Sequence, residues 1–86
     1  MTRSKCLDAA KACVLGDREE THGKPADVFG MVAAMWSAYL GVKIAPCDVA
    51  MMMCLLKAAR FAHNPKWIDH AVDICGYSAI AAELAP

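Results

Sequence analysis

Two pairs of charged side chains interrupt otherwise apolar segments in the second half of the chain. Lys57 and Arg60 form the first pair, and Asp69 and Asp73 form the second. Side chains three or four residues apart share one face of a helix. Charges on a face surrounded by apolar side chains are costly unless they are paired or hold a ligand. These four residues therefore form either an internal ion-pair layer or the floor of an anion or metal site.

The two acids have the spacing of a cation site. Asp69 and Asp73 lie four residues apart and could share Mg²⁺ or Mn²⁺, with water completing the coordination shell. Asp48, near the start of the preceding helix, is a candidate third ligand. The alternatives are structural, because the acids could instead pair with Lys57 and Arg60, and an acid in a first helical turn is stabilised by the macrodipole alone. The side-by-side negative charges of Asp69 and Asp73 favour a metal or a solvated ligand cleft.

The two cations are candidate phosphate ligands. Arg60 can bind phosphate through two parallel N–H bonds, and Lys57 can act as a point charge, which together would suit a triphosphate or a phosphodiester. His63 and Asn64 close the same helix and are further candidates for ligand binding. A histidine at a helix C-terminus is also favoured by the dipole, which gives His63 a purely structural interpretation.

A polar loop separates the first two expected helices. It contains Asp17, Arg18 and His22 between the glycines Gly16 and Gly23. The helix that follows offers free N–H groups to an anion at its N-terminus. The loop is either a segment that closes over a ligand, with these three side chains as binding residues, or a solvated connector.

Length and composition predict one small domain over residues 1–86. Fifty-eight per cent of the 86 residues are hydrophobic, and a folded chain of this size buries only about 60–65% of the surface that its unfolded form exposes. We therefore expect a homodimer or larger oligomer whose interface completes the core. The five cysteines lack a C-x-x-C pair, which favours buried, reduced thiols in a cytoplasmic protein.

Charge and hydropathy also bear on partners. The formal net charge is zero, which gives no electrostatic attraction to duplex nucleic acid or to an anionic membrane. Lys57 and Arg60 interrupt the longest apolar run before it reaches the ~18–20 residues that span a bilayer. The N-terminal residues lack the apolar region of a signal peptide. We expect no membrane association.

Helical periodicity without any period-two alternation predicts an all-α fold. The expected helices are residues 3–15, a segment from about Pro25 that stops at Gly41, a segment that begins at Ile44-Ala45-Pro46 and ends at Asn64-Pro65, and about residues 66–84. Gly16 is expected to be a C′ glycine, Gly41 to end the second helix, and Pro25 and Pro46 to occupy first turns. Short loops between such helices predict an antiparallel four-helix bundle.

A larger set of residues resembles a family of short phage and prophage proteins of unknown function. The matching segments follow one another over nearly the whole chain: Gly16-Asp17-Arg18, His22-Gly23-Lys24-Pro25, Phe29, Met35-Trp36-Ser37-Ala38-Tyr39-Leu40-Gly41, Asp48 to Met53, Leu55-Leu56-Lys57, Ala59-Arg60, His63-Asn64-Pro65, Asp69, Val72-Asp73 and Gly76-Tyr77. The chain departs from the usual pattern at His22, where tyrosine is commoner, and at Ala45, where a capping Thr or Ser is commoner.

That family in turn is similar to the all-α MazG-like nucleoside triphosphate pyrophosphatases, the dATP/dGTP diphosphohydrolase group. In those enzymes an E-x-x-E motif on one helix and an E-x-x-D motif on a later helix hold Mg²⁺ over the triphosphate. The resemblance places Asp69 and Asp73 on the second motif, with His70 where an acid often stands. Lys57 and Arg60 occupy the place of the first motif. The resemblance thus implies a MazG-like helical bundle that faces a nucleotide.

Two functions follow as hypotheses. The first is binding of a nucleotide, with hydrolysis of a (d)NTP to (d)NMP and pyrophosphate if Mg²⁺ is held by Asp69, Asp73 and Asp48. In this hypothesis the named residues contribute to catalysis only by binding the metal. The second is a non-catalytic counter-defence protein, which inhibits a host defence protein or sequesters a cyclic or oligonucleotide signal in the cytoplasm of an infected or lysogenic bacterium. Carboxylate supply on the third helix separates the two, and it favours binding over hydrolysis.

Overall fold

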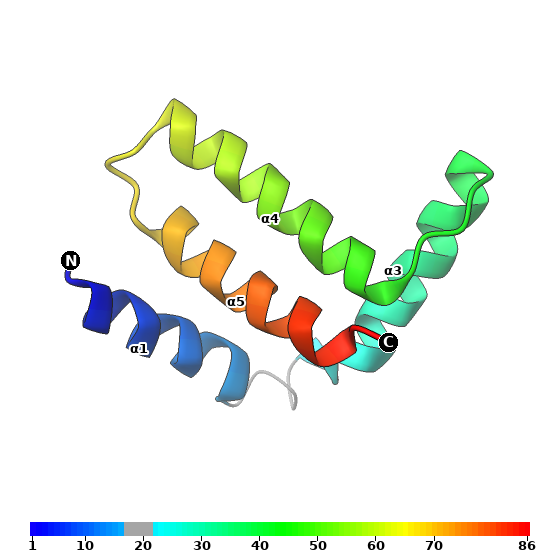
Figure 1. The fold of residues 1–86 in the computed structure, drawn as a ribbon, viewed down its shortest axis with the longest axis horizontal. Coiled ribbons are helices and arrows are strands. Elements are labelled where there is room, and N and C mark those ends of the chain that lie inside the picture. Colours follow the sequence, from blue (N-terminus) through cyan, green and yellow to red (C-terminus); the bar gives the residue numbers. More distant parts are fainter. Residues whose placement is uncertain (17–21) are drawn as a thin grey trace.

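The computed structural model describes residues 1–16 and 22–86 and is all-α (Figure 1). The helices that it names in this part of the chain are α1 (Arg3–Leu15), α3 (Pro25–Leu40), α4 (Pro46–His63) and α5 (Asp69–Leu84). The expected bounds of the first helix are confirmed, and the next two helices begin and end at the expected start and stop signals. The fourth begins three residues later than expected.

Local sequence explains where the helices begin. The Thr2 side chain accepts a hydrogen bond of 3.2 Å from the Lys5 N–H and caps α1. Pro25 and Pro46 occupy the first turns of α3 and α4, where a missing N–H costs nothing. Gly41 ends α3, as expected, and does so in the left-handed conformation with φ of 70°.

Two local expectations are wrong. Gly16 ends α1, but its backbone is extended, with φ of −79°, and is not left-handed. Its N–H nevertheless donates to the Ala12 carbonyl and closes the last turn. α5 does not begin at Lys66, because the Trp67 N–H first closes a turn on the Asn64 carbonyl. The residues after Asn64 are used to reverse the chain before the next helix can start.

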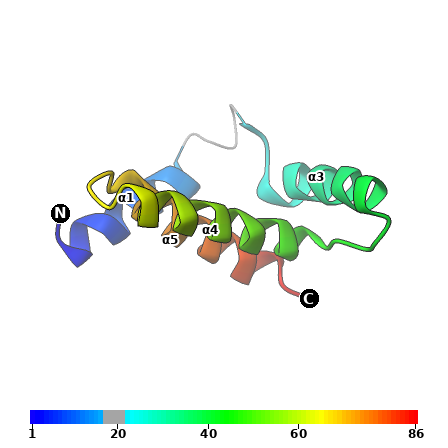
Figure 2. The same ribbon diagram turned by 90° about the horizontal axis from the view of Figure 1, so that it is seen from above.

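The most extensive helix contacts follow the order α1, α5, α4, α3. α4 and α5 form an antiparallel hairpin with the most extensive contact, α1 packs on α5, and α3 packs on α4 (Figure 1). α1 and α5 run in the same general direction in Figure 1 and cross in Figure 2. The part of the chain that is described is therefore all-α, with four packed helices.

A pair of hydrogen bonds fixes the corner between α3 and α4. The Ser37 hydroxyl accepts a bond of 2.8 Å from the Ile44 N–H and donates one of 3.3 Å to the Ile44 carbonyl. Asp48 accepts a bond of 2.9 Å from the Ala45 N–H at the start of α4. The connection from residue 41 to residue 45 is thus attached to both helices that it joins.

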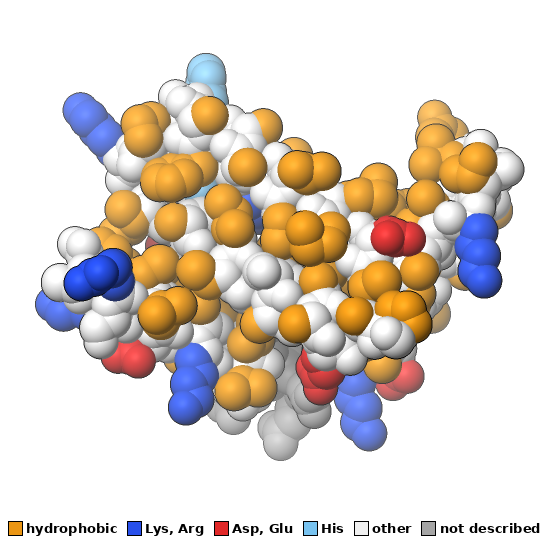
Figure 3. Space-filling model, viewed as in Figure 1, with side chains coloured by type: hydrophobic (Ala, Val, Ile, Leu, Met, Phe, Trp, Pro, Cys, Tyr) orange, Lys and Arg blue, Asp and Glu red, His pale blue; other side chains and the backbone are white. Residues whose placement is uncertain are grey.

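The core is made of small side chains. The buried hydrophobic residues are Ala10, Ala33, Val49, Ala50, Cys54, Val72 and Ala81. None of the described residues has a large side chain that is fully buried. Large apolar side chains instead remain on the surface, and Figure 3 shows them gathered over α4 and over the free end of α3. None of the four named helices is both long and apolar enough to cross a membrane.

Candidate functional site

The α4–α5 hairpin brings one cation and one acid of the two predicted pairs together. Lys57 Nζ lies 2.9 Å from Asp73 Oδ2, and their side chains are 15% and 35% exposed. The antiparallel packing of α4 on α5 places these residues opposite one another. Of the two interpretations of the charged residues, the ion pair is therefore correct for Lys57 and Asp73.

The other two members of the pairs are on the surface. Arg60 and Asp69 are both exposed, and neither forms a salt bridge within residues 1–16 and 22–86. Asp69 begins α5, where a negative charge is stabilised by the helix dipole. The expected layer of four charges is thus reduced to one ion pair.

The predicted set of three metal ligands is not assembled. Asp48 accepts a hydrogen bond from the Ala45 N–H and acts as a helix cap. It lies nine residues before Lys57, which corresponds to about 13 Å along α4, away from Asp73. The described residues contain no group of three His, Cys, Asp or Glu side chains that could hold a metal ion. In the described residues, Asp69, Asp73 and Asp48 are therefore not brought together as one ligand set.

The remaining predicted ligand residues divide into three groups. His22 lines a pocket, which is described below. His63 and Asn64 are exposed at the end of α4, where the Asn64 N–H donates to the Arg60 carbonyl. Asp17 and Arg18 lie outside the described residues.

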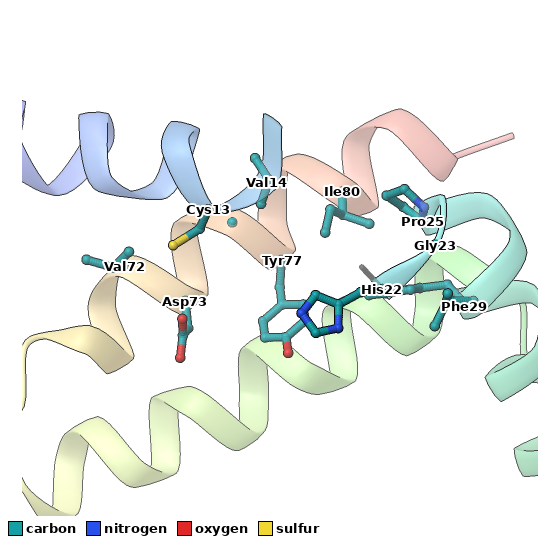
Figure 4. A pocket seen from close by; sticks show the side chains of 12 residues that line it. Cys13, Val14, His22, Gly23, Pro25, Phe29, Val72, Asp73, Tyr77 and Ile80 are labelled. Carbon is teal, nitrogen blue, oxygen red and sulfur yellow. The ribbon is translucent and has the colours of Figure 1, made fainter. Parts of the chain in front are cut away.

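A pocket of about 240 Å³ lies where the end of α1, the start of α3 and the middle of α5 meet (Figure 4). Most of its wall is apolar. The polar side chains that line it include His22, Asp73 and Tyr77. The Phe29 and Tyr77 rings form part of the wall, with centroids 6.2 Å apart and planes tilted by 42°. This tilted arrangement is a favourable aromatic pair.

Two glycines make this pocket possible. Gly76 is buried where α1 packs on α5, and a Cβ at this position would lie 3.0 Å from Val14 Cγ1. Gly23 has φ of +83°, a conformation that L side chains rarely adopt, and leads the chain into Pro25 at the start of α3. The pocket therefore depends on close helix approach at one wall and on a left-handed residue at the other.

Sequence reasoning missed the pocket wall. Phe29 and Tyr77 were identified only as part of the family resemblance. A signal was present, because a glycine inside a helical pattern, here Gly76, often marks close approach of another element. The partner of that approach could not be read from the sequence.

Asp73 connects the pocket to the ion pair. Asp73 is one of the residues that line the pocket, and one of its carboxylate oxygens contacts Lys57 on α4. Figure 4 shows the Asp73 carboxylate, the Tyr77 hydroxyl and the His22 ring on the same side of α5. Hydrogen-bond acceptors and donors are thus concentrated at one side of an otherwise apolar space.

The cysteines are free, as predicted, but they are not uniformly covered. Cys54 is buried, its Sγ lies 3.7 Å from the Ile74 carbonyl, and burial raises the pKa of its thiol. Burial also raises the pKa of Cys75, and the neighbouring Cys6 raises it further. Cys13 is exposed, which contradicts the expectation that the thiols are buried.

These environments predict an order of thiol reactivity. The thiolate is the reactive form, so a raised pKa and low exposure both slow alkylation. Cys13 should react with iodoacetamide first, and Cys54 and Cys75 last. Peptide mapping by mass spectrometry after timed labelling at neutral pH measures this order. Equal rates at all five sites, matching those in denaturant, would contradict the packing of α1, α4 and α5.

Comparison with known proteins agrees with the sequence resemblance. The model of a family described as a domain of unknown function, DUF6378, matches residues 5–85. The chain belongs to this family. The chain is also similar to the Gene 55 protein of Mycobacterium phage L5, which is 38% identical over 79 residues, or 91% of this chain and 51% of the relative. The Gene 55 protein of Mycobacterium phage D29 is 33% identical over 78 residues, or 91% of this chain and 52% of the relative.

The chain thus spans about half the length of these two curated relatives. No solved structure matches it. The resemblance to phage proteins of unknown function is confirmed at the level of the family. The similarity to MazG-like enzymes stays a prediction.

Proposed function

We propose that this DUF6378 protein binds a nucleotide, with the base in the pocket between α1, α3 and α5. The observation that carries the proposal is the combination of an aromatic wall, Phe29 and Tyr77, with the Asp73 carboxylate and its Lys57 partner. A base requires a flat apolar contact and a few polar groups that read its edge. This pocket offers both.

The size of the pocket favours one ring system rather than a whole nucleotide. Its volume of about 240 Å³ is below the ~300–1,000 Å³ typical of sites for drug-sized ligands. A base can stack on an aromatic side chain, a contact worth about 1–3 kcal/mol. The Asp73 oxygen that does not contact Lys57 is available to accept a hydrogen bond from the N–H groups of a base. The sugar and phosphates would then lie outside the pocket.

The phosphates are proposed to lie towards α4. Lys57 uses one direction of its ammonium for Asp73 and has further donors for a phosphate oxygen. Arg60 follows three residues later on the same helix and is exposed, so its guanidinium can bind an anion without a large desolvation cost. This assignment keeps the predicted roles of Lys57, Arg60 and His22, and it leaves His63 and Asn64 outside the binding site.

The carboxylates of the described residues support nucleotide binding without hydrolysis. Hydrolysis of a (d)NTP by the expected mechanism needs a metal held by several carboxylates. In the described part of the chain, Asp73 is paired, Asp48 caps α4, and Asp69 is isolated at the start of α5. Retention of a nucleotide signal, as in the counter-defence hypothesis, needs binding alone. The counter-defence function would therefore use the same binding site.

Two histidine variants test the proposal. His22 and His63 are both exposed, so replacing either with alanine should leave the fold intact, but only His22 lines the pocket. We expect His22→Ala to weaken nucleotide binding about 5- to 20-fold, the loss of roughly one hydrogen bond. His63→Ala should change it less than about twofold. Isothermal titration calorimetry with each (d)NMP and (d)NTP, with Mg²⁺ and with EDTA, measures both effects.

Several outcomes would contradict the proposal. If no nucleotide produces heat in the titration or shifts an amide NMR signal of the protein, the protein does not bind nucleotides. Equal losses in His22→Ala and His63→Ala would move the site to the end of α4. Release of pyrophosphate from a (d)NTP in the presence of Mg²⁺, abolished by Asp69→Asn, would replace binding by hydrolysis.

A further inference from the structure

α3 has the composition of a buried helix but not its environment. From Val28 to Val42 the chain contains no Asp, Glu, Lys or Arg. A helix that is apolar all round is normally buried in a protein core or in a membrane. With 16 residues α3 is shorter than the ~20 residues of a membrane-spanning helix. In the structure only Ala33 of this helix is buried.

The uncovered side of α3 is one continuous face. Val28, Met31, Met35 and Tyr39 recur at helical spacing and are 38%, 67%, 56% and 89% exposed. This spacing puts them on the side of the helix opposite Ala33. The exposed residues Ala34 and Ala38 lie beside them, and these six residues are called the α3 face. Figures 1 and 2 show that the C-terminal half of α3 extends beyond the other helices.

The total surface indicates how much of it a partner would have to cover. The chain exposes 6191 Å². A compact folded monomer of 9.2 kDa is expected to expose about 4,900 Å². The excess of roughly 1,300 Å² exceeds the ~800 Å² that each partner buries in a standard stable interface. Burial of ~800 Å² per copy in a dimer would lower the exposed surface to about 5,400 Å², closer to the value expected for its mass.

We propose that the α3 face packs against the same face of a second copy of this chain in a two-fold symmetric dimer. A two-fold interface is self-complementary, so an uncharged apolar patch needs no partner of opposite charge. The side chains of the α3 face carry no charge at all, which argues against nucleic acid and against a charged protein surface. Homodimer interfaces are the most apolar class of protein contacts. Methionine, enriched in such interfaces, supplies two of the four large side chains of the face.

Sedimentation equilibrium at micromolar concentrations tests the dimer. Wild type should have a mass about twice 9.2 kDa. Ala34→Lys places an unpaired ammonium at the interface twice, once from each copy, and should raise the dissociation constant by about 100-fold or more. Ala82→Lys introduces the same change at an exposed position of α5, outside the α3 face, and should leave the dimer unchanged.

A second variant guards against misfolding of the first. Tyr39 is 89% exposed in the single chain, so Tyr39→Ser cannot damage the monomer core, but it should still weaken the dimer about tenfold or more. Far-ultraviolet circular dichroism shows whether each variant keeps its helices. A wild-type monomer throughout the micromolar range would overturn the proposal. The proposal would also be overturned if Ala34→Lys and Tyr39→Ser both fold and form dimers with the same dissociation constant as Ala82→Lys.

Discussion

Replacing Asp73 with asparagine should lower the free energy of unfolding by about 1–3 kcal/mol. The change leaves the Lys57 ammonium, whose side chain is 15% exposed, without its carboxylate at 2.9 Å. A fully buried pair broken in this way costs about 3–5 kcal/mol, and an exposed pair contributes about 0–1 kcal/mol. The 35% exposure of Asp73 places the expected loss between these limits. Urea denaturation of wild type and variant measures it.

Asp69→Asn is the matched control, because it makes the same change one turn earlier on α5 at an exposed residue. It should cost less than about 1 kcal/mol, the scale of a first-turn acid at the helix dipole. The Lys57→Met/Asp73→Asn double variant should recover part of the loss of Asp73→Asn. If Asp73→Asn is as stable as wild type, or more stable, the ion pair does not contribute and mutual repulsion of Asp69 and Asp73 governs the site. That outcome is the one that the sequence alone favours.

Replacing Gly76 with leucine should have the largest effect on the fold. A Cβ at Gly76 already approaches Val14 Cγ1 to 3.0 Å, so a leucine side chain has to push α1 away from α5 or fill the pocket that Gly76 lines. Overpacking of this kind costs about 1–3 kcal/mol or more, even though leucine is the better helix former. We expect α1 to separate from α5 and the pocket, which Gly76 and Val14 both line, to lose its shape. Thermal unfolding and hydrogen exchange of α1 amides measure the two effects.

Gly30→Ala provides the contrast on another helix. A Cβ at Gly30 meets nothing within 4 Å of its own chain, so the helix propensity of alanine should act unopposed. The expected change is a gain of about 0.5–1 kcal/mol. If Gly76→Leu and Gly30→Ala unfold at the same temperature, the close approach of α1 and α5 is not required for folding.

The sequence predicted the elements of this fold better than their packing. Pro25, Pro46 and Gly41 act within one helical turn, and the bounds that depend on them were correct. The beginning of α5 was predicted too early, because a turn closed by Trp67 and Asn64 competes with the helix there. The order of helices in space was missed because apolar residues cover most sides of α3 and α4, so periodicity does not indicate which side meets which helix.

The candidate site shows the same division. The sequence allowed Lys57 and Asp73 either to form an ion pair or to face a ligand. The alignment of α4 against α5 places them opposite one another, and they form the ion pair. Asp48 could not join Asp69 and Asp73, because antiparallel packing puts the start of α4 far from the start of α5. The contact of Phe29 with Tyr77 joins residues distant in sequence and has no local signal. Local chemistry was therefore predictable, and the meeting of distant side chains was not.

The small side chains of the core have a consequence for how the chain unfolds. The slope of stability against denaturant and the heat capacity of unfolding both scale with the apolar surface that unfolding newly exposes. Here the buried hydrophobic residues are alanines, valines and a cysteine, while leucines and methionines are already in contact with water. An isolated chain should therefore unfold over a broad range of urea, with a slope below that usual for its length. A steep transition whose midpoint rises with protein concentration would mean that much of the newly exposed surface comes from between chains.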